Sequence, residues 1–216
     1  MAEKFSPGLL IVTLAVTTLF FIVGILIGNV ITSSKTQGIT DLRESLRLEM
    51  LDLELQGQLF EQNPCTSHYI YTLGETLDDL GSRLTMLEDQ LGKNDKQVID
   101  LKKPYTELMI QHYLLINKRV EKCNENYIII LFFYSNNPDA VDDSKKQGYA
   151  LNYLADKYGY EKVKVYSIDA DLDLGIVNAL TETYNVTMIP TTIVNDKIYS
   201  GYHTSDEFEE DFSFTS

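Results

Sequence analysis

The chain has two cysteines in 216 residues, and they are the side chains best suited to redox chemistry. A pair of thiols can form a structural disulfide, cycle as a reactive dithiol, or remain as two unrelated buried thiols. Only His68 and Lys122 lie near Cys65 and Cys123 in sequence, and neither is placed as a dedicated activating neighbour. A structural disulfide is therefore the first hypothesis, and the other two interpretations stay open.

The positions of the two cysteines favour that pairing. Cys65 precedes one predicted helix and Cys123 follows the next, with the turn between the helices centred near Lys93. The arms are about 28 and 30 residues long, and an antiparallel hairpin with equal arms brings its open ends together. We expect a Cys65–Cys123 disulfide, which stabilises the fold by about 4 kcal/mol through loop-closure entropy. A stable disulfide also favours an oxidising compartment.

The sequence offers no support for metal or cofactor chemistry. Its histidines are scattered along the chain: His68, His112 and His203. Asp169, Asp171 and Asp173 have the spacing of the first ligands of a calcium-binding EF-hand loop. However, Leu174 and Leu180 stand where that loop requires glycine and glutamate, so helix capping is the better interpretation. We predict no metal site and no cofactor.

The charge balance excludes one class of partner. The chain has 32 acidic and 18 basic residues, a formal net charge of -14. From Asn124 onward there are 16 acidic and 6 basic residues, so most of the excess lies in the C-terminal part. Nucleic-acid binding needs clustered Lys and Arg to neutralise phosphates, and the sequence has no such cluster. We expect no nucleic-acid partner.

A long apolar run near the N-terminus predicts a membrane anchor. No charged residue occurs between Lys4 and Lys35, and residues 9–31 are long enough to span a bilayer as a helix. No small-residue cleavage site follows, so we expect an uncleaved single-pass anchor in a cell membrane after a short tail, residues 1–8. Basic residues after the run weakly favour a cytoplasmic C-terminus. The expected disulfide favours the extracytoplasmic face, which we adopt.

Residues 32–40 read as a polar linker, and residues 41–123 predict a helical stalk. Its second helix carries an unbroken seven-residue repeat: Ile70, Leu73, Leu77, Leu80, Leu84, Leu87 and Leu91. Such a repeat predicts a coiled-coil-like seam, with Gly74 and Gly81 letting a neighbouring backbone approach. Gly92 ends that helix, and Asn94 or Asp95 caps the next, which runs to about Val120. The seam packs within the chain or, as the alternative, forms a homodimer interface over Ile70–Leu91.

Residues 124–216 predict an α/β domain. Residues 127–134 form a continuous apolar run typical of a buried strand, and residues 162–168, 192–194 and 197–200 predict three more. Helices are expected over residues 141–158, 172–184 and 205–212. This order of elements predicts a mixed sheet with helices on both faces.

The segment Ile189-Pro190-Thr191, with the residues around it, resembles the part of thioredoxin-like proteins where a cis-proline precedes a strand. Asp169 similarly resembles the acidic turn of that family. The resemblance covers about 90 residues. It implies a cis Ile189–Pro190 bond facing the loop after the first strand of the domain.

That loop departs from the family pattern. The family carries Cys-x-x-Cys there, whereas residues 135–141 read SNNPDAV, so thiol chemistry at this position is excluded. A glutathione-orienting role for Ser135 finds little support, because glutathione transferases carry their helical domain after this fold. The remaining surface is a candidate groove for polypeptide, with these residues: Ser135, Asn136, Asn137, Pro138, Ile189, Pro190 and Thr191.

The leading hypothesis is a membrane-anchored protein whose redox-inactive thioredoxin-like domain binds or scaffolds a protein or peptide. We expect recognition rather than catalysis, with no catalytic residue. The alternative is a membrane-anchored thiol-disulfide oxidoreductase, or an accessory to one, in which Cys65 and Cys123 cycle.

Overall fold

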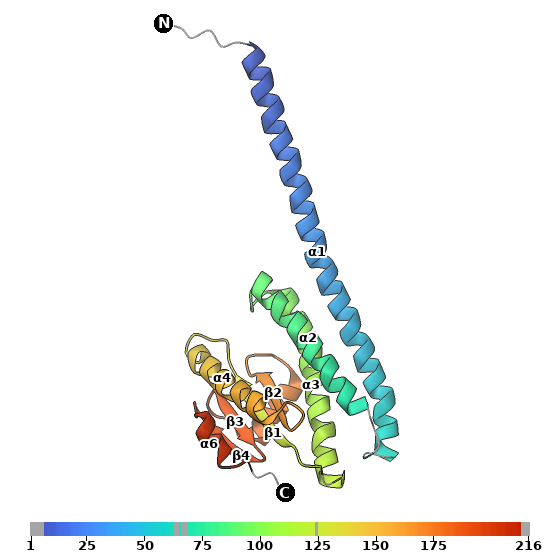
Figure 1. Ribbon diagram of the computed structural model, residues 1–216, viewed down its shortest axis with the longest axis vertical. Coiled ribbons are helices and arrows are strands. Elements are labelled where there is room, and N and C mark those ends of the chain that lie inside the picture. Colours follow the sequence, from blue (N-terminus) through green and yellow to red (C-terminus); the bar gives the residue numbers. More distant parts are fainter. Residues whose placement is uncertain (1–6, 63–64, 66–68, 124, 213–216) are drawn as a thin grey trace. The chain divides into compact units, whose positions relative to one another are not determined.

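The computed structural model describes residues 7–62, 65, 69–123 and 125–212, and their helices and strands are drawn in Figure 1. The chain divides into two compact units, residues 1–44 and 45–216. One helix, α1 (Pro7–Gln62), runs through the boundary between them. All other elements belong to the second unit.

The first unit contains the apolar part of α1. Gly8–Gly28 has a mean hydropathy of 2.8 and buries none of its surface, so by length and composition it can cross a membrane. The hydroxyl groups of Thr13 and Thr17 donate to the carbonyl groups of Leu9 and Thr13, over 3.0 and 2.9 Å. These hydroxyls are therefore satisfied without water, as a lipid-facing helix requires. In the described part of the chain, this is the one helix of that character.

The linker expected at residues 32–40 is helical instead. α1 continues through it to Gln62 rather than beginning again near Asp41. The segment is polar, but it holds no proline and a single glycine, Gly38, so nothing in it interrupts the helical hydrogen bonds. Polarity alone does not end a helix that water can solvate. The residues expected to end it, 63–64, lie outside the described residues.

The helical hairpin consists of α2 (Tyr69–Leu91) and α3 (Lys96–Cys123). Gly92 ends α2 with φ +96°, a conformation that side chains disfavour, and its N–H donates to the Glu88 carbonyl over 2.8 Å. Asp95 then accepts a 2.8 Å hydrogen bond from the Gln97 N–H, which confirms it as a cap. The seam residues from Ile70 to Leu87 are buried within the chain. These side chains therefore pack inside a single copy of the chain. The homodimer through this seam stays a prediction.

The two glycines beside the seam accommodate aromatic rings rather than a neighbouring backbone. A Cβ at Gly74 would lie 3.6 Å from the ring of His112, and one at Gly81 would lie 2.7 Å from the hydroxyl of Tyr105. Both rings come from α3. The glycines therefore make room for large side chains of the partner helix, which the spacing alone did not indicate.

The second unit also contains a sheet, with strands β1 (Ile128–Tyr134), β2 (Val163–Asp169), β3 (Thr191–Val194) and β4 (Lys197–Ser200). In the described residues the strand order is β2-β1-β3-β4. β1 pairs with β2 in parallel, and β3 pairs with β1 and β4 antiparallel. The strands differ from their predicted bounds by one residue at most. This mixed sheet, with the helices around it, is a thioredoxin-like fold.

Helices cover both faces of the sheet. α4 (Val141–Tyr158) and α6 (Ser205–Glu209) pack on one face, in a core that includes Phe132, Leu154 and Phe208. The remaining helix, α5 (Gly175–Thr183), begins after the turn that follows β2. α3 contacts the opposite face, where its His112 and Tyr113 pack against Tyr166 of β2. The hairpin is therefore a layer of the thioredoxin-like unit, rather than the separate stalk that was expected over residues 41–123.

Candidate functional site

Strand pairing brings the two halves of the candidate groove together. Phe133 of β1 lies opposite Thr191 of β3, so the loop that begins at Ser135 lies beside Pro190. The Ile189–Pro190 peptide bond is cis, as the resemblance implied. Pro190 and Thr191 are buried and Ile189 is half-buried, whereas Asn137 and Pro138 are exposed. Of the residues expected to form the groove, only some are therefore accessible to a ligand, chiefly Asn137 and Pro138.

The carboxylate of Asp171 holds the loop after β1. It accepts hydrogen bonds from the Ser135 hydroxyl at 2.8 Å, the Asn136 N–H at 2.9 Å and the Asn137 side-chain amide at 2.7 Å. The Asn137 N–H also donates to the Ser135 hydroxyl oxygen over 3.0 Å. Ser135 is itself 4% exposed. Its hydroxyl therefore serves the loop's internal structure, which leaves no role for it in orienting glutathione.

A second carboxylate, Asp169, ties the same loop to the hairpin. Asp169 accepts from the Lys102 ammonium at 2.6 Å, from the Asn136 side-chain amide at 3.0 Å and from the Asp171 N–H at 3.0 Å. Lys102 also lies 3.1 Å from a carboxylate oxygen of Glu88. The network thus joins α2, α3, β2 and the loop. Such fully hydrogen-bonded buried charges hold a site in one geometry.

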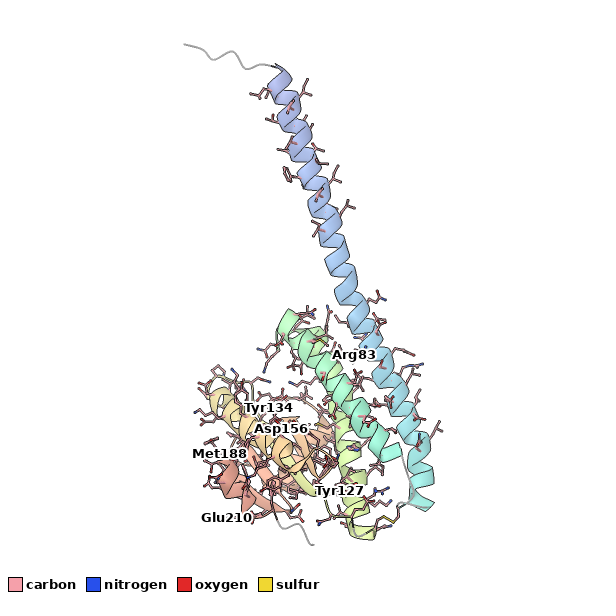
Figure 2. The ribbon with its side chains drawn as sticks, in the orientation of Figure 1. Arg83, Tyr127, Tyr134, Asp156, Met188 and Glu210 are labelled. Atoms are coloured by element: carbon pink, nitrogen blue, oxygen red, sulfur yellow. A yellow bond between two sulfur atoms is a disulfide. The ribbon has the colours of Figure 1, made fainter. Side chains whose placement is uncertain are left out.

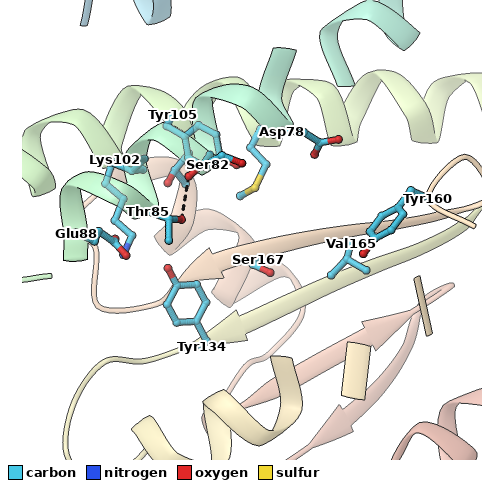
Figure 3. A pocket seen from close by; sticks show the side chains of 14 residues that line it. Asp78, Ser82, Thr85, Glu88, Lys102, Tyr105, Tyr134, Tyr160, Val165 and Ser167 are labelled. Carbon is cyan, nitrogen blue, oxygen red and sulfur yellow. Dashed lines mark hydrogen bonds and ion pairs between the residues drawn. The ribbon is translucent and has the colours of Figure 1, made fainter. Parts of the chain in front are cut away.

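Lys102 stays charged in this network. Burial alone would lower the pKa of its ammonium, but interactions with Tyr134, Asp169 and Glu88 outweigh burial and raise the pKa above its usual value. The ammonium lies 5.3 Å from the centre of the Tyr134 ring. Burial raises the pKa of Tyr134 to about 12, against the opposing effect of Lys102, so its hydroxyl is neutral at physiological pH. Figure 3 shows the Lys102 side chain reaching towards Glu88 and Tyr134.

The tip of the hairpin meets the same loop. The ammonium of Lys93, in the turn between α2 and α3, donates to the Asn136 side-chain oxygen over 3.2 Å. Asn136 therefore receives contacts from the hairpin tip, from Asp169 and from Asp171. The loop that carries thiols in the related fold is here fixed by polar contacts on several sides.

The disulfide lies at the opposite end of β1. Cys65 and Cys123 are joined with a Cα–Cα distance of 5.5 Å, and the bond is drawn in yellow at the C-terminal end of α3 in Figure 2. This confirms the pairing expected from the equal arms of the hairpin. β1 begins at Ile128, soon after Cys123, and its seven residues separate the disulfide from Ser135 by about 20 Å. The disulfide and the candidate groove are therefore separate places in the fold.

The sequence alone did not predict that four residues of this site form one polar network: Glu88, Lys102, Asp169 and Asp171. Lys102 carried a usable signal. It lies on the α3 stripe that includes Met109, Tyr113 and Ile116, and a single charge on an apolar stripe indicates a buried ion pair. Asp171 carried no such signal, because the groups that donate to its carboxylate become its neighbours only when β1 and β2 pair. In the described residues, no group of three His, Cys, Asp or Glu side chains is placed to hold a metal ion.

Comparisons with known proteins find partial similarity to solved structures alone. No protein-family model matches the sequence. A search of curated proteins likewise finds no match. Among solved structures, a chloroplastic thioredoxin z is similar at 16% identity and a TM-score of 0.35, over 44% of this chain and 84% of that one. The germline-specific thioredoxin Deadhead of Drosophila melanogaster is similar at 25% identity and a TM-score of 0.30, over 46% and 88%. The assignment of the fold depends on the strand order, the pairing and the cis-proline described above.

Proposed function

We propose that the chain is a membrane-anchored, redox-inactive thioredoxin-like protein that binds polypeptide at a recognition surface formed by residues 135–138 and 188–191. The observation that carries this proposal is the position of Asp171. A loop that had merely lost its thiols would have no reason to be fixed by three hydrogen bonds to one carboxylate. A fixed loop beside a cis-proline is a preorganised surface, and preorganisation lowers the entropic cost of binding.

The exposed groups of the recognition surface suit an extended polypeptide. Met188 is 55% exposed and precedes the cis bond, and Asn137 and Pro138 are exposed on the facing loop. A flexible thioether adapts to differently shaped apolar side chains. The Asn137 backbone and side chain supply polar groups next to it. An apolar contact beside hydrogen-bonding groups is a general pattern of peptide recognition.

The membrane anchor and the disulfide support an extracytoplasmic location for the second unit. Stable disulfides persist in oxidising compartments, and the Cys65–Cys123 bridge is best explained there. Protease digestion of intact cells tests this point. Digestion of the second unit from outside intact cells is expected, and full protection would place it in the cytoplasm instead.

Site-specific photo-crosslinking in the full-length protein tests the recognition surface. A benzoylphenylalanine in place of Met188 is expected to form polypeptide adducts, whereas the same residue in place of Asn152, exposed on α4, serves as the control. Asp171→Asn in the same protein should reduce the adducts by releasing the loop, and Asp173→Asn should not. Equal adducts from both positions, or adducts that Asp171→Asn leaves unchanged, would contradict the proposal.

One observation favours the alternative function. Cys65 is exposed, so a reductant or a partner thiol can reach the disulfide. A reduction potential well above about −300 mV would support an oxidoreductase or an accessory to one, and a lower value would support a structural bridge. The distance of about 20 Å along β1 argues against a catalytic cycle in which the recognition surface presents substrate to these cysteines.

A further inference from the structure

We propose that the outer edge of β2 is a second docking site, which accepts an extended polypeptide segment with a basic side chain as an additional strand. The site is distinct from the recognition surface, which lies between the loop after β1 and the start of β3. It uses the backbone of β2 and the inward side of α2, and it does not depend on the cis-proline.

The hydrogen bonds of β2 show which of its backbone groups face outward. The Ile128 N–H donates to the Lys162 carbonyl over 2.9 Å, and the Ala170 N–H donates to the Tyr134 carbonyl over 2.8 Å. With the register of Ile128 opposite Val163, the even-numbered residues of β2 therefore bond to β1. The N–H and C=O groups of Val165 and Ser167 therefore point away from the sheet, whereas the outward N–H of Val163 already donates to the Gly159 carbonyl over 3.0 Å. β2 has no strand partner on that side in the part of the chain that the structure describes.

A cavity lies beside these outward groups. It measures about 550 Å³, and Val165 and Ser167 form one wall (Figure 3). Residues of α2, among them Asp78, Ser82 and Thr85, form the facing wall. The volume of this cavity lies within the range of about 300 to 1,000 Å³ that is typical of ligand sites. Exposed edges are usually sealed, but here the covering helix leaves room next to the edge.

The geometry favours a strand over a compact ligand. Outward N–H and C=O groups alternate along an edge with the repeat that an extended peptide presents, so backbone hydrogen bonds form in register. Short side chains on the facing helix, Ser82 and Thr85, keep the space open. A strand in this space would satisfy the outward groups and pack its alternate side chains against α2.

The charges around the cavity select a basic side chain. Asp78 and Glu88 line it, and Asp169 lies next to Lys102 at its end. Lys102 is the one cation among the lining residues, and its ammonium already contacts both Glu88 and Asp169. The nearby Lys164 donates to the Tyr160 carbonyl over 2.7 Å, and its charge also acts on Asp78. The acidic groups therefore exceed the basic ones, and Asp78 is the carboxylate best placed to meet an incoming Lys or Arg.

Fluorescence anisotropy with full-length protein in lipid nanodiscs tests the docking site. The probe is a fluorescein-labelled heptapeptide, Thr-Val-Lys-Val-Arg-Val-Thr, and the comparison peptide carries Glu in place of Lys and Arg. We expect saturable binding of the basic peptide and binding at least tenfold weaker for the acidic one. Hydrogen exchange at the amides of Val165 and Ser167 should slow when the basic peptide is bound.

Two serines at opposite edges of the sheet provide a matched pair of variants. Ser167→Pro removes an outward N–H of β2 without breaking a bond to β1, and it should weaken binding at least tenfold. Ser200→Pro is the control at the β4 edge. Its N–H also faces outward, because Val194 and Lys197 close the two-residue turn and the bonded pairs alternate from there. Ser200→Pro should leave binding unchanged.

A charge reversal on α2 keeps the proposal testable if a proline variant fails to fold. Asp78→Lys should abolish binding of the basic peptide and favour the acidic one, whereas Asp79→Lys, outside the cavity lining, should not. The absence of saturable binding to the wild type, or wild-type binding by Ser167→Pro or Asp78→Lys, would overturn the proposal. Concentration-dependent protection of the same amides without peptide would overturn it in favour of a second copy. Binding lost in Asp171→Asn but kept in Ser167→Pro would assign the peptide to the recognition surface.

Discussion

The ammonium of Lys102 on α3 lies 2.6 Å from a carboxylate oxygen of Asp169 at the end of β2, and both side chains are 8% exposed. This buried ion pair joins the helical hairpin to the sheet at the edge of the proposed recognition surface. Glu88 completes the group from α2 at 3.1 Å. Because Asp169 also accepts from Asn136 and from the Asp171 N–H, the position of the loop depends on an ion pair between residues 67 positions apart in the chain.

Replacing Lys102 tests the structural importance of this pair. Lys102→Met keeps the length of the side chain but leaves two buried carboxylates without their cation, so we expect a loss of about 3–5 kcal/mol in the free energy of unfolding. The measurement is urea unfolding of the full-length protein in detergent. Lys146→Met is the matched control, because its 2.8 Å pair with Asp143 is exposed to solvent and should contribute nothing measurable. Equal stability of the two variants would contradict the interpretation of Lys102.

The carboxylate of Asp171 is expected to control the mobility of the loop without controlling the fold. Asp171→Asn weakens three hydrogen bonds, and amide exchange at Asn136 and Asn137 should accelerate. Hydrogen exchange measured by mass spectrometry reports this locally, and the melting temperature should move little. Asp173→Asn, in the same turn, is the control. Unchanged exchange in Asp171→Asn would show that other contacts suffice to hold the loop.

His112 predicts a specific loss of stability in mild acid. Burial lowers the pKa of its imidazole to about 4, while its ring nitrogens face the Ile70 carbonyl at 3.0 Å and the Tyr166 hydroxyl at 3.1 Å. The unfolded state has a pKa near 6.5 and binds the proton first, so the stabilising effect is complete above about pH 6.5 and is lost as pH falls towards 4. The loss amounts to about 3 kcal/mol.

Unfolding curves at pH 7 and pH 4.5 check this prediction. His112→Phe removes the titrating group and should reduce the pH dependence by most of that amount, even if the variant is less stable at pH 7. The change in stability between the two pH values is compared between the wild type and the variant, so the carboxylate contributions that the two proteins share cancel. A variant that keeps the full pH dependence would show that other groups cause it.

The disulfide should contribute more to stability than any exposed contact. Replacing both cysteines with serine opens a loop of 58 residues, and loop-closure entropy predicts a loss of about 4 kcal/mol. Urea unfolding of the double variant measures this loss. Reduction of the wild type should lower stability by a similar amount, and it should leave the double variant unaffected. A small effect in both cases would mean that α2 and α3 are held together mainly by their seam.

The helices and strands of this chain could be predicted from short stretches of sequence, but the packing of the helices on the sheet could not. β1 was predictable from an uninterrupted apolar run, with its start one residue later in the structure, and the helix expected over residues 141–158 has the same bounds as α4. The disulfide was predictable because two arms of equal length leave their ends together. In contrast, α1 was expected to break at residues 32–40, because polarity was taken as a sign of a linker when only proline or glycine would have interrupted it.

The candidate site could be predicted only in part. The cis-proline segment was evident from Ile189, Pro190 and Thr191, and its neighbour loop from its place after β1. The role of Asp171 depends on the pairing of β1 with β2, which no short stretch of sequence encodes. The placement of α3 on the sheet was missed for a similar reason. Its second apolar stripe is compatible with any apolar surface, and Tyr166 of β2 supplies that surface only after folding.

The Cys65–Cys123 bond also determines how mechanical load passes through the chain. α1 ends at Gln62, three residues before Cys65, and β1 begins five residues after Cys123. A pull between the apolar N-terminal helix and the sheet therefore passes through the sulfur atoms and bypasses the hairpin. With the bond intact, the 58-residue separation, about 200 Å of extended chain, cannot be drawn out. Reduction would allow the distance between α1 and β1 to grow by up to that length.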